Sequence, residues 1–334
     1  MEDIMVKIIK PTVVVSKCIE FARCRYNGAM ISSDVVKILK NFVEFIPVCA
    51  EVEIGLGVPR DSIRIIKQND GLKLIQSATS LDVTNKMNTF AEEFLNSLEH
   101  VDGFILKYKS PSCGTLHTPY LASIHKGAAK LGRGPGSFGK AVIEKFPKLP
   151  IENEGRLNNF RIREHYLTKL FTIARFREVK YSNRMHKLVQ FHTVNKFLFM
   201  AYNQAEMREM GRIVANPEKN SFNEVVKEYE RRLFNVIMYP PKYTSNINVL
   251  MHMLGYFSKD LTSEEKAYFL DELEKYRAGW ISLFVLTHLL KSWIVRFNQE
   301  YLQSQTFFDP FPEELMIFDL KNTWRGRSYW QKPQ

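Results

Sequence analysis

The sequence predicts an α/β N-terminal domain with a parallel, Rossmann-like sheet, followed by an all-α helical bundle domain. Three observations predict this arrangement. Short β-branched runs alternate with helical patterns over the first 150 residues, as in parallel sheets with crossover helices. Residues 132–158 are rich in Gly, Pro and Asn, so regular structure should break there. From residue 160 onward, helical periodicity dominates. We therefore expect domains at residues 1–152 and 153–334.

Each expected strand of the N-terminal domain leads toward a cysteine. Strands are predicted at residues 12–16, 46–48 and 103–107, with helices over 33–45 and 84–98. Cys18, Cys49 and Cys113 follow the three strands. Because ligands gather at the carboxyl ends of parallel strands, we expect these three thiols to converge in one crevice.

The C-terminal domain shows a succession of helical patterns. The Pro-Pro pair at 240–241 predicts one sharp connection between them. The expected helices span residues 161–176, 185–211, 222–238, 247–257, 263–278 and 281–302.

Composition restricts where the protein works. The chain has no apolar run of about 18 residues and no signal-peptide pattern, so we expect a cytoplasmic protein that does not bind membranes. A reducing compartment disfavours disulfides among the four cysteines, which all lie in the first third of the chain. Metal binding or catalysis explains these cysteines better.

Three interpretations of the cysteines follow from the residues alone. Buried cysteines are common in apolar cores, but Cys18 and Cys113 lie in polar turn sequences. Structural zinc prefers close pairs such as C-x-x-C, and the nearest pair here, Cys18 and Cys24, has five residues between its members. Three thiolates on a four-iron cluster would leave one iron open to a substrate sulfur atom.

Four separated blocks occur in the order of a known family's motifs. They are residues 16–18 (SKC), 24–28 (CRYNG), 47–60 (PVCAEVEIGLGVPR) and 109–114 (KSPSCG). This set resembles the thiouracil desulfurase family. The resemblance implies a 4Fe-4S cluster held by Cys18, Cys49 and Cys113. Where that family usually reads Cys-Pro-Glu, this chain has Ala50, and Cys24 matches a block that supplies no ligand, so it is a nearby thiol or an occasional fourth ligand.

The resemblance also implies the catalytic residues. Glu51 would move protons and Ser110 would donate a hydrogen bond to the substrate, whereas the residues alone favour a turn carboxylate and a turn hydroxyl. Arg25, Arg60 and Ser112 are candidate substrate contacts that could equally brace loops.

A strongly basic segment begins the helical half. The chain carries a net charge of +11, and residues 156–196 contain ten Lys or Arg against two acidic residues. Residues 188–192 (LVQFH) and 250–257 (LMHMLGYF), with Lys196, resemble the helical domain fused to desulfurases that act on 4-thiouridine in tRNA. We therefore expect tRNA binding through Arg161, Arg163, Lys169, Arg175, Arg177, Lys180, Arg184, Lys187, His192 and Lys196, although a solvated helix surface is the commoner explanation for charged pairs of this kind.

The combined prediction is an iron-sulfur-dependent, non-redox desulfurase. It would convert 4-thiouridine in tRNA to uridine, free thiouracil to uracil, or both, and release sulfide without an obligate protein partner. Two alternatives stay open: a cysteine-based sulfurtransferase with Cys113 as nucleophile, and a non-catalytic RNA-binding protein stabilised by metal.

Overall fold

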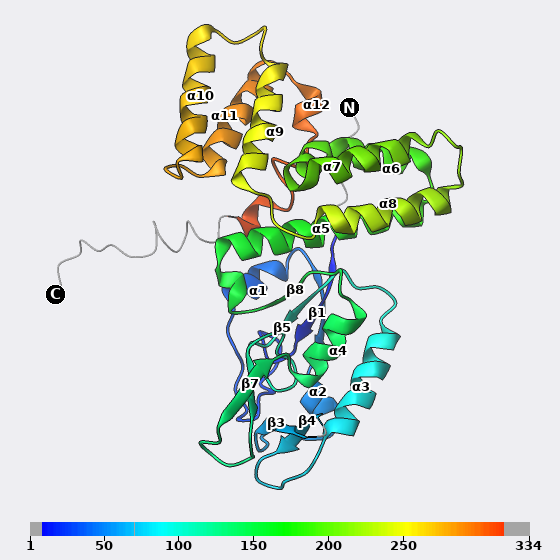
Figure 1. Ribbon diagram of the computed structural model, residues 1–334, viewed down its shortest axis with the longest axis vertical. Coiled ribbons are helices and arrows are strands. Elements are labelled where there is room, and N and C mark those ends of the chain that lie inside the picture. Colours follow the sequence, from blue (N-terminus) through cyan, green and yellow to red (C-terminus); the bar gives the residue numbers. More distant parts are fainter. Residues whose placement is uncertain (1–8, 70, 317–334) are drawn as a thin grey trace, which may run out of the picture. The chain divides into compact units, whose positions relative to one another are not determined.

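A computed structural model describes residues 9–69 and 71–316, which form two compact units (Figure 1). The first unit comprises residues 9–174 with 312–316, and the second comprises residues 175–311. The predicted domain ends at residues 1 and 334 lie outside the described residues. The predicted boundary at residue 152 stays a prediction: the last strand ends at Asn153, but the compact unit continues to Ala174.

The first unit is built on a parallel sheet, as the sequence predicts. The strand order is β2-β1-β5-β8, and all three pairings are parallel. The strands are β1 (Thr12–Ser16), β2 (Glu44–Val48), β5 (Gly103–Leu106) and β8 (Ile151–Asn153). Because Ser16 is level with Val48 and Leu106 with Asn153, the carboxyl ends of the strands meet at one edge.

Apolar side chains cover this sheet from both faces. On one face, Val14 and Phe104 pack with Met87 of α3 (Thr84–Ser97) and Phe138 of α4 (Ser137–Lys145), all without solvent exposure. On the other face, α5 (Phe160–Ser182) approaches β5 so closely that a Cβ at Gly103 would lie 2.9 Å from Leu170. Glycine therefore allows the helix to reach the strand.

A second sheet, which the sequence analysis did not predict, extends the same unit. Its strand order is β4-β3-β6-β7, with antiparallel β3–β4 and β6–β7 pairs joined by a parallel β3–β6 pair. The strands are β3 (Ile63–Gln68), β4 (Gly71–Gln76), β6 (Thr118–Leu121) and β7 (Lys130–Gly134). Ile63, Ile65 and Leu74 join the apolar core beneath α3.

Two local predictions for this unit are wrong. The helix expected over 33–45 ends earlier, as α1 (Asp34–Leu39), because residues 44–45 pair with β1 in the sheet and this pairing outweighs their helical periodicity. The segment 132–158, expected to be irregular, contains α4 and β8. Gly136 and Gly139 there serve close packing and do not end the helix.

The second unit is helical, as predicted. It contains the end of α5 and the helices α6 (Met185–Val194), α7 (Lys196–Ala215), α8 (Phe222–Val236), α9 (Tyr243–Tyr256), α10 (Ser263–Arg277), α11 (Leu283–Arg296) and α12 (Glu300–Gln303). Phe176, Phe191 and Tyr229 form an aromatic core with ring centroids 5.5 and 5.6 Å from Phe176. Among the described residues, no helix is both long and apolar enough to span a bilayer.

The single helix predicted over 185–211 is wrong, because the chain breaks between α6 and α7 at Asn195. The buried Asn195 side chain donates to the Phe191 carbonyl at 2.8 Å and accepts from the Thr306 hydroxyl at 2.6 Å. A side chain that bonds the backbone four residues earlier competes with the helical pattern.

Candidate active site at the strand ends

The three predicted ligand cysteines lie at the same edge of the parallel sheet. Cys49 follows β2 directly, Cys18 lies two residues beyond β1, and Cys113 lies in the loop after β5. All three are buried free thiols. The charge of Cys49 acts on Cys18, and the charges of both act on Cys113. The structure thus places the three thiols after neighbouring parallel strands, and their role as cluster ligands stays a prediction.

Burial raises the pKa of two of these thiols, Cys18 and Cys113. Desolvation, followed by the charge of Cys49, raises the pKa of Cys18 to about 12. Desolvation also raises the pKa of Cys113 well above its ordinary value, while a hydrogen bond from the Ser16 hydroxyl acts in the opposite direction. A neutral thiol is a poor nucleophile, and it must also lose its proton before it can bind iron.

Cys24 joins the same group of thiols. It hydrogen bonds to Cys49, and the Cys49 sulfur lies 3.8 Å from the Cys24 carbonyl oxygen. Desolvation and the charges of Cys49 and Cys18 raise the pKa of Cys24 to about 12. The structure thus places a fourth thiol beside the three predicted ligands.

The thiols are not arranged around a single ion. Within residues 9–69 and 71–316, no three His, Cys, Asp or Glu side chains lie close enough to hold one metal ion. Thiolates on one zinc ion approach each other to about 4 Å, because Zn–S bonds are about 2.3 Å long in a tetrahedral site. The cysteines of a multi-iron cluster bind different irons and need not approach so closely.

Glu51 occupies the first turn of α2 (Ala50–Glu53), directly after Cys49, and two neighbours hold its carboxylate. Arg60 donates to Oε2 from Nη2 at 2.7 Å and from Nε at 2.8 Å, while the Ser112 hydroxyl donates to Oε1 at 2.9 Å. The Glu51 side chain is 13% exposed. The carboxylate is therefore fixed in position but still accessible from the surface.

Arg60 and Ser112, the predicted substrate contacts, brace this site from inside. The Arg60 side chain is only 3% exposed and also donates to the carbonyls of Cys24 and Gly57, at 3.1 and 2.9 Å. Ser112 is fully buried. The structure gives no support for direct substrate contact by either residue, because the polar groups of both already bond to Glu51 or to the backbone. Arg25 lies apart from this network, with its guanidinium 5.7 Å from the centre of the Tyr26 ring.

Ser110 organises the loop that carries Cys113. Its hydroxyl oxygen accepts the backbone N–H groups of Ser112 and Cys113, at 3.2 and 3.1 Å. Since these bonds use the oxygen, the hydroxyl proton is free to donate to another group.

The first turn of α4 holds the same loop in place. Backbone N–H groups of Gly136, Ser137 and Gly139 donate to loop carbonyls at 2.7–2.9 Å. A Cβ at Gly139 would lie 2.2 Å from the Gly114 oxygen, so glycine is required for this approach. The loop is therefore bound along its length to a helix.

Sequence reasoning missed three polar residues of this site. Ser16 ends β1, Lys107 follows β5 and Glu154 follows β8. Lys107 forms an ion pair with Glu154, and both charges act on Cys18. Their position at strand ends is the signal that could have identified them, but β8 was not expected in the sequence.

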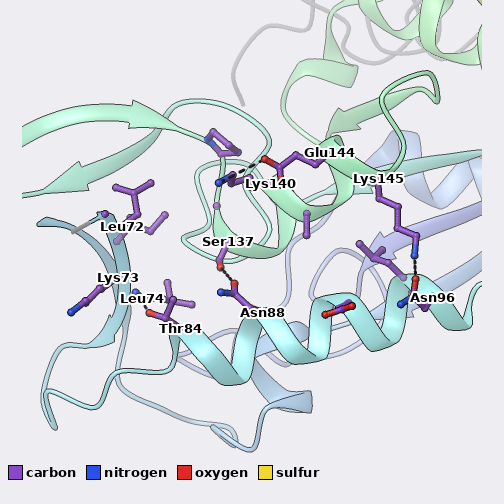
Figure 2. A pocket seen from close by; sticks show the side chains of 17 residues that line it. Leu72, Lys73, Leu74, Thr84, Asn88, Asn96, Ser137, Lys140, Glu144 and Lys145 are labelled. Carbon is purple, nitrogen blue, oxygen red and sulfur yellow. Dashed lines mark hydrogen bonds and ion pairs between the residues drawn. The ribbon is translucent and has the colours of Figure 1, made fainter. Parts of the chain in front are cut away.

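The first unit also contains a separate hollow. It has a volume of about 840 Å³ and is lined by α3, α4 and the β3–β4 hairpin. Figure 2 shows polar side chains along it, including Asn88, which lies 3.3 Å from the Ser137 hydroxyl, and Lys145, which contacts Asn96. None of the predicted site residues lines this hollow.

The basic residues predicted to contact tRNA divide into two groups. Arg163 and Arg175 point inward and donate to the carbonyls of Leu157 and Pro310, and burial lowers the pKa of Lys169 to about 8. The others lie at or near the surface: Arg161, Arg177, Lys180, Arg184, Lys187 and Lys196. Arg163 and Arg175 are poorly placed to contact phosphates, because their guanidinium groups bond to backbone carbonyls inside the protein.

His192 belongs with the inward group. Its Nδ1 lies 3.2 Å from the Tyr229 hydroxyl, and burial followed by the charge of Lys196 lowers its pKa to about 4. The ring is neutral at physiological pH, so it offers no positive charge to a phosphate.

The strand-end site lies within a match to a known family. Residues 13–154 match the family model described as 2-thiouracil desulfurase. The N-terminal segment is a 2-thiouracil desulfurase family domain. The resemblance seen in the sequence motifs is thereby confirmed. Residues 196–312 match a second model, described only as a protein of unknown function (DUF1722).

Two similar proteins each align with somewhat less than half of this chain. The uncharacterized protein YbgA of Escherichia coli K12 is 24% identical over 163 residues, which are 48% of this chain and 96% of YbgA. The uncharacterized protein YbbK of Bacillus subtilis 168 is 27% identical over 154 residues, 44% of this chain and 98% of YbbK.

One solved structure with some similarity is described as the 4Fe-4S-dependent thiouracil desulfidase TudS. It is 23% identical, with a TM-score of 0.36, and the match covers 45% of this chain and 94% of TudS.

Proposed function

We propose that this protein removes sulfur from a thiolated pyrimidine at a 4Fe-4S cluster held by Cys18, Cys49 and Cys113. The observation that carries the proposal is the gathering of three buried thiols and the Glu51 carboxylate at one edge of the parallel sheet, inside a desulfurase family domain. Family membership supports thiouracil desulfuration, and the motifs and the placement of the thiols support the ligand set.

The donor set fits such a cluster. Soft thiolates suit iron-sulfur clusters, and the three thiols are neither joined in disulfides nor spaced for one ion. Ser16 supplies a hydrogen bond to Cys113, which is the kind of outer contact that orients a ligand. When bound by three cysteines, the cluster supplies a Lewis-acidic iron with an open position for a substrate sulfur atom.

The chain's own residues supply proton transfer and orientation. Glu51 takes a proton from the water that attacks the ring carbon, since its carboxylate is oriented by Arg60 and Ser112 and accessible from the surface. Ser110 donates its hydroxyl proton to the substrate, because backbone N–H groups already occupy its oxygen.

The test is anaerobic reconstitution with iron and sulfide, followed by measurement of bound iron and of sulfide released from thiouracil. We expect Cys18→Ser, Cys49→Ser and Cys113→Ser each to lose most of the iron, while Cys24→Ser, the matched control at a neighbouring buried thiol, retains it. Glu51→Gln should retain iron and lose at least about 100-fold in rate, the usual contribution of a general acid-base group. Full iron binding by all three variants would refute the ligand set. Sulfide release from thiouracil by the iron-free protein, lost in Cys113→Ser, would instead favour a cysteine-based mechanism.

We further propose that the substrate is 4-thiouridine in tRNA, bound by the helical unit. Arg184, Lys187 and Lys196 support this proposal, because their side chains are exposed and none forms an ion pair with a described residue. Positive groups without acidic partners are available to neutralise phosphates.

A charge-matched comparison tests this substrate. The triple variant Arg184→Gln, Lys187→Gln, Lys196→Gln removes three unpaired charges. The control, Arg212→Gln, Arg231→Gln, Arg277→Gln, removes three exposed arginines that each pair with a glutamate three residues earlier.

The slope of log affinity against log salt for tRNA should fall by about two to three in the first variant and change little in the control. Equal slopes in both variants would exclude these three residues as phosphate contacts. Mass spectrometry of thiolated tRNA after incubation reports the reaction itself.

A further inference from the structure

Every strand of the parallel sheet ends at the thiol site, but the proposed chemistry uses only three of them. The fourth strand, β8, ends at Asn153 and delivers Glu154 to the site edge. Its neighbour β5 ends at Leu106 and delivers Lys107. These two residues form an ion pair whose side chains are only 22% and 11% exposed. A half-buried ion pair at this edge needs a reason, because removing charges from water costs energy.

The Lys107 ammonium is fixed in place. It contacts the Glu154 carboxylate and donates to the Tyr108 carbonyl at 2.9 Å. The other oxygen of Glu154 accepts the Tyr108 backbone N–H at 2.8 Å. The Glu154 carboxylate therefore binds both the Lys107 ammonium and the Tyr108 backbone N–H.

The same turn connects to the proposed ligands. The Lys107 backbone N–H donates to the Ser16 hydroxyl oxygen at 2.9 Å. That bond occupies the oxygen of Ser16, so its proton is directed to the Cys113 sulfur. The charges of Lys107 and Glu154 also act on Cys18, in opposite directions. The pair is thus coupled to two of the three thiols.

We infer that Lys107 is a positioning residue whose ammonium offsets the negative charge of the cysteine-bound cluster, and that Glu154 holds it there. The inference rests on the proposed function, because it concerns the cluster that the three thiols would hold. Net charge and nearby charges set the reduction potential of an iron-sulfur cluster. A positive group beside the cluster stabilises its more negative, reduced form.

The test compares reduction potentials in anaerobically reconstituted full-length variants by redox titration followed with electron paramagnetic resonance. Lys107→Met should shift the potential to a more negative value, and Lys107→Arg should keep it near that of the unsubstituted protein. Glu154→Gln should shift it to a more positive value. Lys109→Met is the matched control, because Lys109 is exposed on the same turn and its ammonium lies over the Tyr108 ring, 4.9 Å from its centre.

Opposite shifts in Lys107→Met and Glu154→Gln separate electrostatics from structure, because loss of a merely structural ion pair would affect both variants in the same direction. Shifts of the same sign, or no shift in either, would overturn the inference. If Lys107→Met does not fold, a negative or zero shift in Glu154→Gln is sufficient to overturn it. Failure of the unsubstituted protein to bind iron would instead refute the proposed function.

Discussion

The contact between Arg60 and Glu51 yields a prediction whose size follows from burial. In Arg60→Met, the guanidinium is lost while the carboxylate stays in place, only 13% exposed. Removing one partner of a buried ion pair costs about 3–5 kcal/mol. Because water reaches the edge of Glu51, we expect the lower end, about 3 kcal/mol. A unit of this size loses about 2–4 °C in melting temperature per kcal/mol, so the expected loss is about 6–12 °C.

The assay is thermal unfolding of the metal-free chain followed by circular dichroism, in a double-mutant cycle. The cycle comprises Arg60→Met, Glu51→Gln and the double variant, and we expect a coupling energy of more than about 1 kcal/mol. Arg64→Met is the matched control, because Arg64 donates to the His125 carbonyl at 2.8 Å and lies near the surface. It should cost less than about 1 kcal/mol.

Strictly additive losses in the double variant would refute the coupling between Arg60 and Glu51. An equal loss of stability in Arg64→Met would show that the loss in Arg60→Met does not depend on the contact with Glu51. In either case, the proposal that Arg60 orients the Glu51 carboxylate would lose its energetic basis. The rate of sulfide release would then depend on Glu51 alone.

Three further predictions concern other parts of the molecule. The pKa of His192 is lowered from 6.5 to about 4, so this group contributes stability that is present above pH 6.5 and is lost as the pH falls, by about 3 kcal/mol at most. Denaturant titrations at neutral pH and near pH 4 should show the loss in the unsubstituted protein and not in His192→Gln. Ser16→Ala should speed the bleaching of the reconstituted protein's visible absorption by a chelator, because Cys113 loses its hydrogen bond; an unchanged bleaching rate would argue against that contact. Gly139→Ala should cost at least about 2 kcal/mol in thermal unfolding, because its Cβ would meet the Gly114 carbonyl oxygen at 2.2 Å, and a neutral effect would mean that α4 can move away from the loop.

The sequence predicted the first sheet and its thiols well because both depend on local signals. The β-branched run of β1 and the apolar run of β5 identified strands, and a cysteine beyond each strand indicated convergence at one edge. The rule that parallel strands place their carboxyl ends together does not depend on distances, so spacings of 31 and 64 residues did not obscure it.

Elsewhere, tertiary contacts outweighed the local pattern. Residues 44–45 continue a helical periodicity but pair with β1 in the sheet. The Gly-rich segment before α4 carries a turn composition, yet glycine there lets a helix approach the loop of Cys113. Asn195 divides a continuous apolar pattern, because its side chain bonds both the backbone and the distant Thr306.

By itself, the sequence determined the α/β and all-α division, the identity of the thiols and the excess of positive charge, since these depend on composition and short-range order. Only the tertiary structure decided which charges face solvent and which face the site. Arg60 became a brace for Glu51, His192 became a neutral, partly buried partner of Tyr229, and Lys107 became the partner of Glu154 at the strand ends. The physical reason is that the ionisation and reach of a side chain depend on burial and on partners distant in the chain, which no local pattern encodes.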